Sequence, residues 1–232
     1  MKRHVFVWLL LAALLFAGVY TYLGTQRIER IRVEVAGEHL QAQALRPLLQ
    51  RWQGAPFWSL DLQQVRKAVE AHPWVAQAQA WRVWPHTLVV RAMAEVPVAR
   101  WDEKGLVDRH GRVFYPPEGT QAFAQLLRLD GPDPATAPAL LALASKLAQQ
   151  ASNWVLMELI AVPGGSVLTR WAKQRPVWLE QGQAALQLAR LQQAWPAVKP
   201  TLRQATDMID LRYSNGFVIK LRKERDGIEK TE

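Results

Sequence analysis

The chain has 232 residues, with 29 Lys and Arg against 20 Asp and Glu, and a formal net charge of +9 at pH 7. Half of its residues are apolar and it contains no cysteine, which excludes a wholly disordered chain and a disulfide-stapled miniprotein. The length allows one or two small domains. A basic excess suits nucleic acid, anionic lipid or an anionic polymer equally, so charge alone does not select a partner.

The N-terminal region predicts a membrane-spanning helix. The 19 residues from 5 to 23 carry no charge, and a helix needs about 20 apolar residues to cross a bilayer. Lys2 and Arg3 precede this segment, and Tyr20 and Tyr22 lie at its end, which favours a cytoplasmic N-terminus and an external remainder. A cleaved signal peptide is the alternative, but the apolar run exceeds the about 7 to 15 residues of a signal core, and no clear A-x-A site follows.

A small domain is predicted next, because apolar periodicity and turn residues define five elements in close succession. They are a strand at 31–37, a helix at 40–52, a second helix capped by Ser59 or Asp61 and ended by Pro73, and strands at 75–83 and 87–95. The order strand, helix, helix, strand, strand packs two helices on one face of a small sheet.

From Pro97 the chain changes to short extended segments that are separated by Gly and Pro turns. Strands are expected within 97–101, 105–111, 112–115, 125–131, 156–162, 167–171 and 176–179, with helices at 136–150 and around 188–195. A last hairpin is predicted from strands at 208–212 and 217–221 joined by a turn at Ser214-Asn215-Gly216. The whole is therefore predicted to be α+β, with a mostly antiparallel second domain that carries accessory helices.

The predicted domain boundaries follow from these elements. They are a short cytoplasmic tail at 1–4, the transmembrane helix at 5–23, a juxtamembrane linker at 24–30, the first domain at 31–96, the second at 97–222, and a flexible tail at 223–232. The C-terminal tail is polar and charged, and is therefore expected to lack a fixed structure.

No catalytic, metal or cofactor site is predicted. None of the serines is followed by Lys at the spacing of a penicillin-binding acyltransferase. The five histidines form no i,i+4 pair, and no cysteine could complete a zinc site. Trp81, Arg82 and Trp84 could build a stacking surface for single strands or sugars. Packing within a small domain explains them better, and no nucleic-acid partner is expected.

Several short motifs stand in a fixed order behind the apolar N-terminal segment. They are Pro73-Trp74-Val75, Trp84-Pro85, Glu95 to Trp101, Leu106-Val107-Asp108, and Asp210-Leu211-Arg212-Tyr213. Each motif is weak alone, but their order and spacing over about residues 5 to 222 resemble the FtsQ family of bitopic bacterial cell-division proteins.

The resemblance implies a POTRA domain followed by a β domain in a non-enzymatic protein that helps to assemble the division complex. It implies a single-pass location in the inner membrane, enriched at the division site, with most of the chain in the periplasm. The implied partners are the periplasmic coiled-coil proteins FtsB and FtsL at the β domain, and other division proteins at the POTRA domain and membrane helix. An exposed edge strand would bind a partner segment by β-addition.

Residue by residue, the resemblance places Arg212, Tyr213, Ser214, Asn215 and Gly216 on the partner-binding hairpin. Tyr213 is the predicted aromatic anchor, because Tyr and Arg commonly dominate interface energetics. The other interpretation is that Asn-Gly only forms the turn and that Tyr213 packs internally. Arg82 falls on a family strand linked to recruitment, so it joins the predicted partner-binding residues.

Three positions depart from the family pattern. The predicted cytoplasmic tail has only about four residues, which puts tail interactions in doubt or places the true start upstream. Leu179-Glu180 stands where the family has Leu-Gly, and Gly164 or Gly165 stands where a basic residue is expected.

Two other classes of protein remain open at this stage. A POTRA-containing transport or secretion component could bind polypeptide by the same β-addition, although such proteins usually carry several POTRA repeats or an outer-membrane barrel. A cell-wall enzyme with an uncleaved signal is the third class, and the absent nucleophile and metal ligands argue against it.

Overall fold

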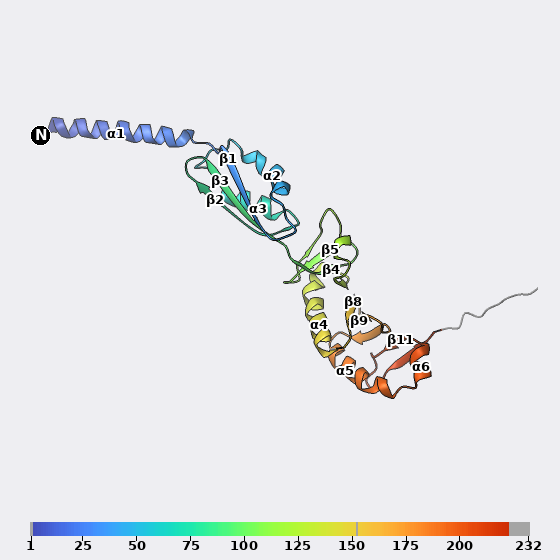
Figure 1. Ribbon diagram of the computed structural model, residues 1–232. Helices are drawn as coiled ribbons and strands as arrows, with labels where there is room; N and C mark the ends of the chain where they lie inside the picture. Colours follow the sequence, from blue (N-terminus) through green and yellow to red (C-terminus); the bar gives the residue numbers. More distant parts are fainter. Residues whose placement is uncertain (1, 152, 223–232) are drawn as a thin grey trace, which may run out of the picture. The chain divides into compact units, whose positions relative to one another are not determined.

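The computed structural model describes residues 2–151 and 153–222 (Figure 1). The chain forms two compact units, one up to Val96 and one from Pro97. Met1, at the start of the predicted cytoplasmic tail, and the predicted C-terminal tail at 223–232 lie outside the described residues.

The first helix, α1, runs from Lys2 to Thr25 and contains the uncharged segment 5–23. Within the part of the chain that the structure describes, no helix meets the length and apolarity that crossing a membrane requires. Directly after α1, Ile28 is fully buried and its N–H donates to the carbonyl of Ala55 at 2.9 Å. Part of the segment expected as a linker therefore packs against the first unit.

The first unit packs two helices on a three-stranded sheet. Its elements are β1 (Arg30–Ala36), α2 (Ala42–Leu49), η1 (Gln50–Trp52), α3 (Leu62–Glu70), β2 (Val75–Val83) and β3 (Thr87–Ala94). The strand order is β1-β3-β2, with β1 parallel and β2 antiparallel to the central strand β3. The predicted order of strand, helix, helix, strand, strand is confirmed.

Local sequence explains both helices of this unit. Asp61 caps α3, because its Oδ1 accepts from the N–H groups of Gln63 at 2.8 Å and Gln64 at 3.3 Å. The two helices bury the apolar side chains that recur along them at helical spacing, namely Leu45, Leu49, Val65 and Val69. Each such buried side chain contributes about 1.5–3 kcal/mol of hydrophobic free energy, so amphipathicity holds the helices on the sheet.

The second unit is built on one mixed sheet of nine strands. The strands are β4 (Pro97–Trp101), β5 (Gly105–Asp108), β6 (Val113–Phe114), β7 (Leu127–Asp130), β8 (Leu156–Val162), β9 (Ser166–Trp171), β10 (Val177–Glu180), β11 (Thr206–Asp210) and β12 (Val218–Leu221). Their order is β12-β11-β10-β9-β8-β7-β4-β5-β6. Five of the eight pairings are antiparallel and three are parallel, so the predicted, mostly antiparallel character is confirmed.

Helices complete the core of this unit. They are η2 (Gln121–Phe123), η3 (Pro134–Thr136), α4 (Ala137–Gln150), α5 (Ala184–Ala194), η4 (Trp195–Ala197) and α6 (Pro200–Ala205). Helix α4 packs on β7 and β8, helix α5 packs on β10, and the two helices contact each other. The predicted inner stripe of α4, which includes Leu140 and Leu147, is buried against Leu159 and Leu188 in one apolar cluster.

The last hairpin differs from its prediction. Strand β11 ends at Asp210 and β12 begins at Val218, so seven residues connect them instead of a tight turn. Neither Asn215 nor Gly216 has the positive φ that a two-residue Asn-Gly hairpin turn needs. Arg212 therefore lies in the connection and not in a strand, and the short helix α6, which precedes β11, was not predicted.

Candidate partner-binding edge

Strand β12 forms one end of the nine-stranded sheet and pairs only with β11. The register places Val218 opposite Asp210 and Leu221 opposite Thr206. Val218 and Leu221 expose 49% and 45% of their surface. No strand in the described part of the chain pairs with the outer side of β12, so its backbone edge and exposed apolar side chains are available to another polypeptide.

The connection after β11 begins with a fixed ion pair. The guanidinium of Arg212 donates to both carboxylate oxygens of Asp210, from Nε to Oδ1 at 3.0 Å and from Nη2 to Oδ2 at 2.7 Å. The N–H of Arg212 also donates to Oδ1 at 3.1 Å. These hydrogen bonds, opposed by a smaller effect of burial, hold the pKa of Asp210 below its ordinary value and raise the pKa of Arg212.

Arg212 is held from a second side by an aromatic ring. Its guanidinium carbon lies 5.0 Å from the ring centroid of Trp178 on β10, within the range of a cation–π interaction. The indole Nε1 of Trp178 lies 2.9 Å from the sulfur of Met208 on β11. Contacts to two neighbouring strands therefore fix the start of the connection to the edge strand.

Tyr213 is exposed over 57% of its surface, so the interpretation that it packs internally is wrong. It lines a pocket of about 340 Å³ together with Leu211, Ser214, Asn215, Gly216 and Phe217 from the connection, and Gln187, Arg190 and Ala194 from α5. Leu211 is buried and Phe217 packs partly against the core. Buried Leu211, half-buried Phe217 and the exposed Tyr213 therefore give the pocket an apolar part of its lining.

The structure brings five of the six predicted binding residues together. Arg212 and the segment 213–216 all lie in the connection between β11 and β12. Arg82 belongs to the other unit, on β2. Its guanidinium donates to the carbonyl oxygens of Phe57 at 2.5 Å, Trp58 at 3.3 Å and Leu60, so a large part of its hydrogen-bonding capacity holds the loop before α3.

The predicted set omitted several residues that shape this site. Asp210 and Trp178 fix Arg212, and Arg190 and Phe217 line the pocket. Opposite charges two residues apart at the end of a strand could have identified the Asp210–Arg212 pair from the sequence. Trp178 and Arg190 carry no such signal, because only the sheet order and the packing of α5 bring them to the edge.

Metal-binding side chains do not gather in the described part of the chain, where no group of three His, Asp or Glu residues is placed to hold an ion. The site consists of a backbone edge, exposed aromatic and apolar side chains, and a fixed arginine. An unpaired sheet edge flanked by exposed apolar side chains has the chemistry that strand addition of a polypeptide requires.

The family comparisons agree on both units. Residues 26–91 match the model of the FtsQ-type POTRA domain, and residues 99–212 match the C-terminal domain model of the cell division proteins FtsQ and DivIB. The chain is 30% identical to Cell division protein FtsQ of Bordetella pertussis over 92% of this chain and 87% of that one. It is 32% identical to FtsQ of Allochromatium vinosum over 83% and 77% of the two chains, and 27% identical to that of Xanthomonas campestris over 95% and 81%.

Proposed function

Because this chain belongs to the FtsQ family of cell-division proteins, we propose that it acts in the division complex as a non-enzymatic scaffold. In this proposal a periplasmic partner of the FtsB or FtsL type adds a strand to the outer edge of β12. The scaffold thereby links that partner to the site where the septum forms. The match of residues 99–212 to the FtsQ/DivIB C-terminal domain favours this role over a POTRA-containing transport component.

The exposed edge of β12 is the observation that carries the proposal. A partner strand would satisfy the backbone groups on the free side of β12, and its side chains would meet Val218 and Leu221. At the start of β12, the Tyr213 pocket of about 340 Å³ could take one large apolar side chain of the partner. Arg212 beside it is already fixed by Asp210, so its guanidinium would lose little conformational entropy when a partner binds.

We also propose that residues 5–23 anchor the chain in the inner membrane, with the N-terminus in the cytoplasm and both units in the periplasm. The absence of charge over this segment and the preceding Lys2 and Arg3 support that topology. The recruiting role of the POTRA unit, including that of Arg82, stays a prediction. The free edge of β2, which carries Arg82, is a surface where such contacts could form.

Strand addition has a signature that tests the mechanism. In an added strand, alternate N–H groups of the partner point to β12 and the others point away. A set of peptides from the FtsB-type partner of the same organism, each with one N-methylated residue, should therefore lose affinity for the full-length chain with a period of two. Uniform sensitivity or none, measured by calorimetry, would show that the partner docks in another way.

A side-chain test complements the backbone test. Tyr213→Ala should weaken partner binding by about tenfold, which is typical of an interface aromatic residue worth about 1.4 kcal/mol. Tyr115→Ala is the matched control, because Tyr115 is similarly exposed at 51% but lies just after β6, at the opposite end of the sheet. Equal effects of the two substitutions would remove the Tyr213 pocket from the mechanism.

A further inference from the structure

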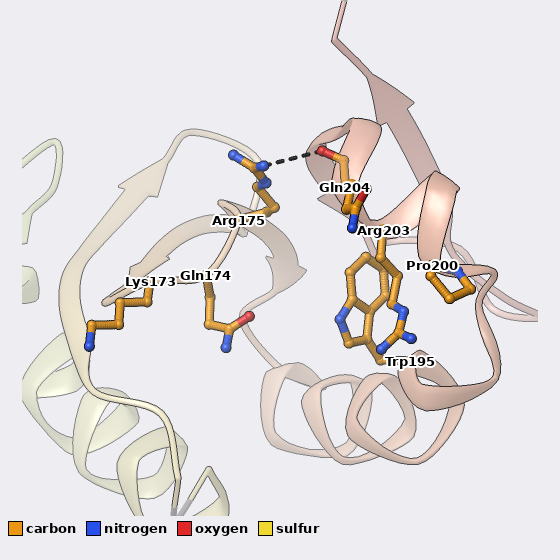
Figure 2. Close-up of a pocket in the computed structure, with 7 residues that line it drawn as sticks. All are labelled: Lys173, Gln174, Arg175, Trp195, Pro200, Arg203 and Gln204. Atoms are coloured by element: carbon orange, nitrogen blue, oxygen red, sulfur yellow. Dashed lines mark hydrogen bonds between the residues drawn. The ribbon is translucent and has the colours of Figure 1, made fainter.

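A second pocket, of about 610 Å³, is lined by residues that lie between β9 and β10 and in η4 and α6 (Figure 2). Figure 2 shows the turn between β9 and β10, with Lys173, Gln174 and Arg175, across from Trp195 and helix α6, which contributes Pro200, Arg203 and Gln204. We refer to these seven residues as the basic pocket. None of the predicted binding residues belongs to it.

The charge of the basic pocket is one-sided. Its lining includes three cations and no carboxylate. Among the residues that the structure describes, Lys173, Arg175 and Arg203 form no ion pair. Arg175 makes one long hydrogen bond, from Nη2 to the carbonyl oxygen of Gln204 at 3.4 Å. Three cations and no carboxylate around one hollow favour an anionic ligand.

One cationic group in the basic pocket lacks a partner although it is shielded from solvent. The Nε atom of Arg203 is buried and makes no hydrogen bond, and a buried donor without an acceptor costs about 1–3 kcal/mol. A ligand carboxylate that reaches Arg203 would offer an acceptor to its guanidinium. The half-buried Trp195 supplies an apolar surface beside it.

The basic pocket lies at the end of the edge strand. Gln204 precedes Ala205, whose carbonyl oxygen accepts from the N–H of Arg222 at 2.8 Å, directly after β12. The register also brings Leu221, the last residue of β12, opposite Thr206, the first residue after α6. A partner strand that follows β12 by about 3.3 Å per residue would therefore pass from one pocket toward the other.

We propose that the basic pocket binds an acidic segment of the same polypeptide whose strand pairs with β12. This inference rests on the proposed function, and it adds a second contact that selects partners by charge. The side-chain amides of Gln174 and Gln204 can pair with both the N–H and C=O groups of a peptide backbone. A polypeptide with carboxylates therefore uses the lining more fully than a small inorganic anion does.

The test compares two peptides that differ only in charge. Both contain the strand segment of the FtsB-type partner of the same organism, and four residues, either Glu or Gln, extend the end that faces the basic pocket. With the full-length chain in phosphatidylcholine nanodiscs, the Glu peptide should bind more tightly at low salt. An exposed ion pair is worth up to about 1 kcal/mol, or about fivefold in affinity, and salt weakens it.

Matched variants locate the effect. Arg175→Gln and Arg203→Gln should each reduce the preference for the Glu peptide over the Gln peptide by up to about fivefold. Lys146→Gln, on the exposed face of α4, should leave this preference unchanged. Equal urea midpoints establish that the variants fold. If Arg203→Gln lowers the urea midpoint, the test of the basic pocket depends on Arg175→Gln alone. The Arg175 guanidinium makes only one long hydrogen bond, so its loss should not affect folding.

The outcomes separate this inference from the proposed function. If both peptides lose affinity periodically on N-methylation but bind equally well, strand addition holds and the basic pocket has no acidic segment to bind. If neither peptide binds the wild-type chain, both proposals fall. If the variants weaken binding to vesicles with anionic phosphatidylglycerol but leave the Glu preference intact, the pocket faces lipid and the inference is overturned.

Discussion

Replacement of Asp210 by Asn tests how far an ion pair fixes the connection to the edge strand. The substitution keeps the shape of the side chain but removes the charge that Arg212 contacts at 2.7 and 3.0 Å. Asp210 is 15% exposed and Arg212 is 44% exposed, so solvent screens the pair only partly. An exposed pair contributes about 0.2–1 kcal/mol, and two-point geometry places this pair at the upper end. We expect Asp210→Asn to lower the free energy of unfolding by about 1 kcal/mol.

The loss of stability in Asp210→Asn should depend on pH, because the pKa of Asp210 is lowered in the folded state. The largest cause of the lowered pKa is the hydrogen bond from the Arg212 side chain. A carboxylate with a folded-state pKa below its unfolded value of about 3.9 stabilises the fold above that value. The contribution disappears as the pH falls through the folded-state pKa. The difference between wild type and Asp210→Asn should therefore be complete at pH 7 and should shrink below about pH 4.

A double-mutant cycle measures the pair directly. Urea unfolding of wild type, Asp210→Asn, Arg212→Gln and the double variant gives the coupling free energy, which we expect to be about 0.5–1 kcal/mol at pH 7. Because the chain has two units, the transition of the second must be identified first, and Leu159→Ala marks it, since Leu159 is buried in that core. A coupling below about 0.2 kcal/mol, or one that persists undiminished at pH 3, would refute the reasoning.

Other substitutions test the rest of the fold by urea unfolding monitored with circular dichroism. Arg82→Met should destabilise the first unit by about 2–3 kcal/mol, because carbonyl groups of the loop 57–60 would lose their hydrogen-bond donor. Arg82→Lys should restore only part of the lost stability. Gly111→Ala should cost about 1–3 kcal/mol, since φ is +83° and the new Cβ would lie 2.5 Å from a backbone carbon, whereas Gly164→Ala, with open space around it, should cost less. Leu159→Ala should cost about 2–5 kcal/mol. No change in stability for any of these would contradict the packing on which it rests.

Local patterns were sufficient to predict the helices and strands of the first unit, but not the parallel pairing of β1 with β3. The helix capped by Asp61 and the paired strands at 75–83 and 87–94 depend on residues close together in the chain, and the β2–β3 register connects neighbouring segments. The sheet order of the second unit could not be predicted in this way. Its parallel pairings, such as that of β10 with β11, join segments that are far apart in the chain, and nothing in the two sequences predicts that they pair.

Site residues that are neighbours in the sequence were predicted, whereas residues that only the fold brings together were missed. Arg212 and Tyr213 are neighbours in a motif, so the resemblance found both. Arg175 and Arg203 are 28 positions apart, and the turn before β10 and helix α6 bring them to one pocket. The hairpin prediction failed because an Asn-Gly pair indicates a tight turn only when its backbone adopts positive φ, and here the Asp210–Arg212 pair starts a longer connection.

The positive charge along the free edge of β12 disfavours pairing between the β12 strands of two copies of this chain, while it leaves the edge open to a different polypeptide. An unpaired edge is a site of self-association unless charge, bulges or short length protect it. Strand β12 has four residues, the neighbouring strand β11 carries an irregularity between Thr206 and Met208, and Lys220 and Arg222 lie in or directly after β12. Two such edges would bring like charges together, which is unfavourable, whereas an acidic strand would neutralise them. In the proposed strand addition, the basic excess of the chain, which selects no partner by itself, would favour an acidic strand where Lys220 and Arg222 border this edge.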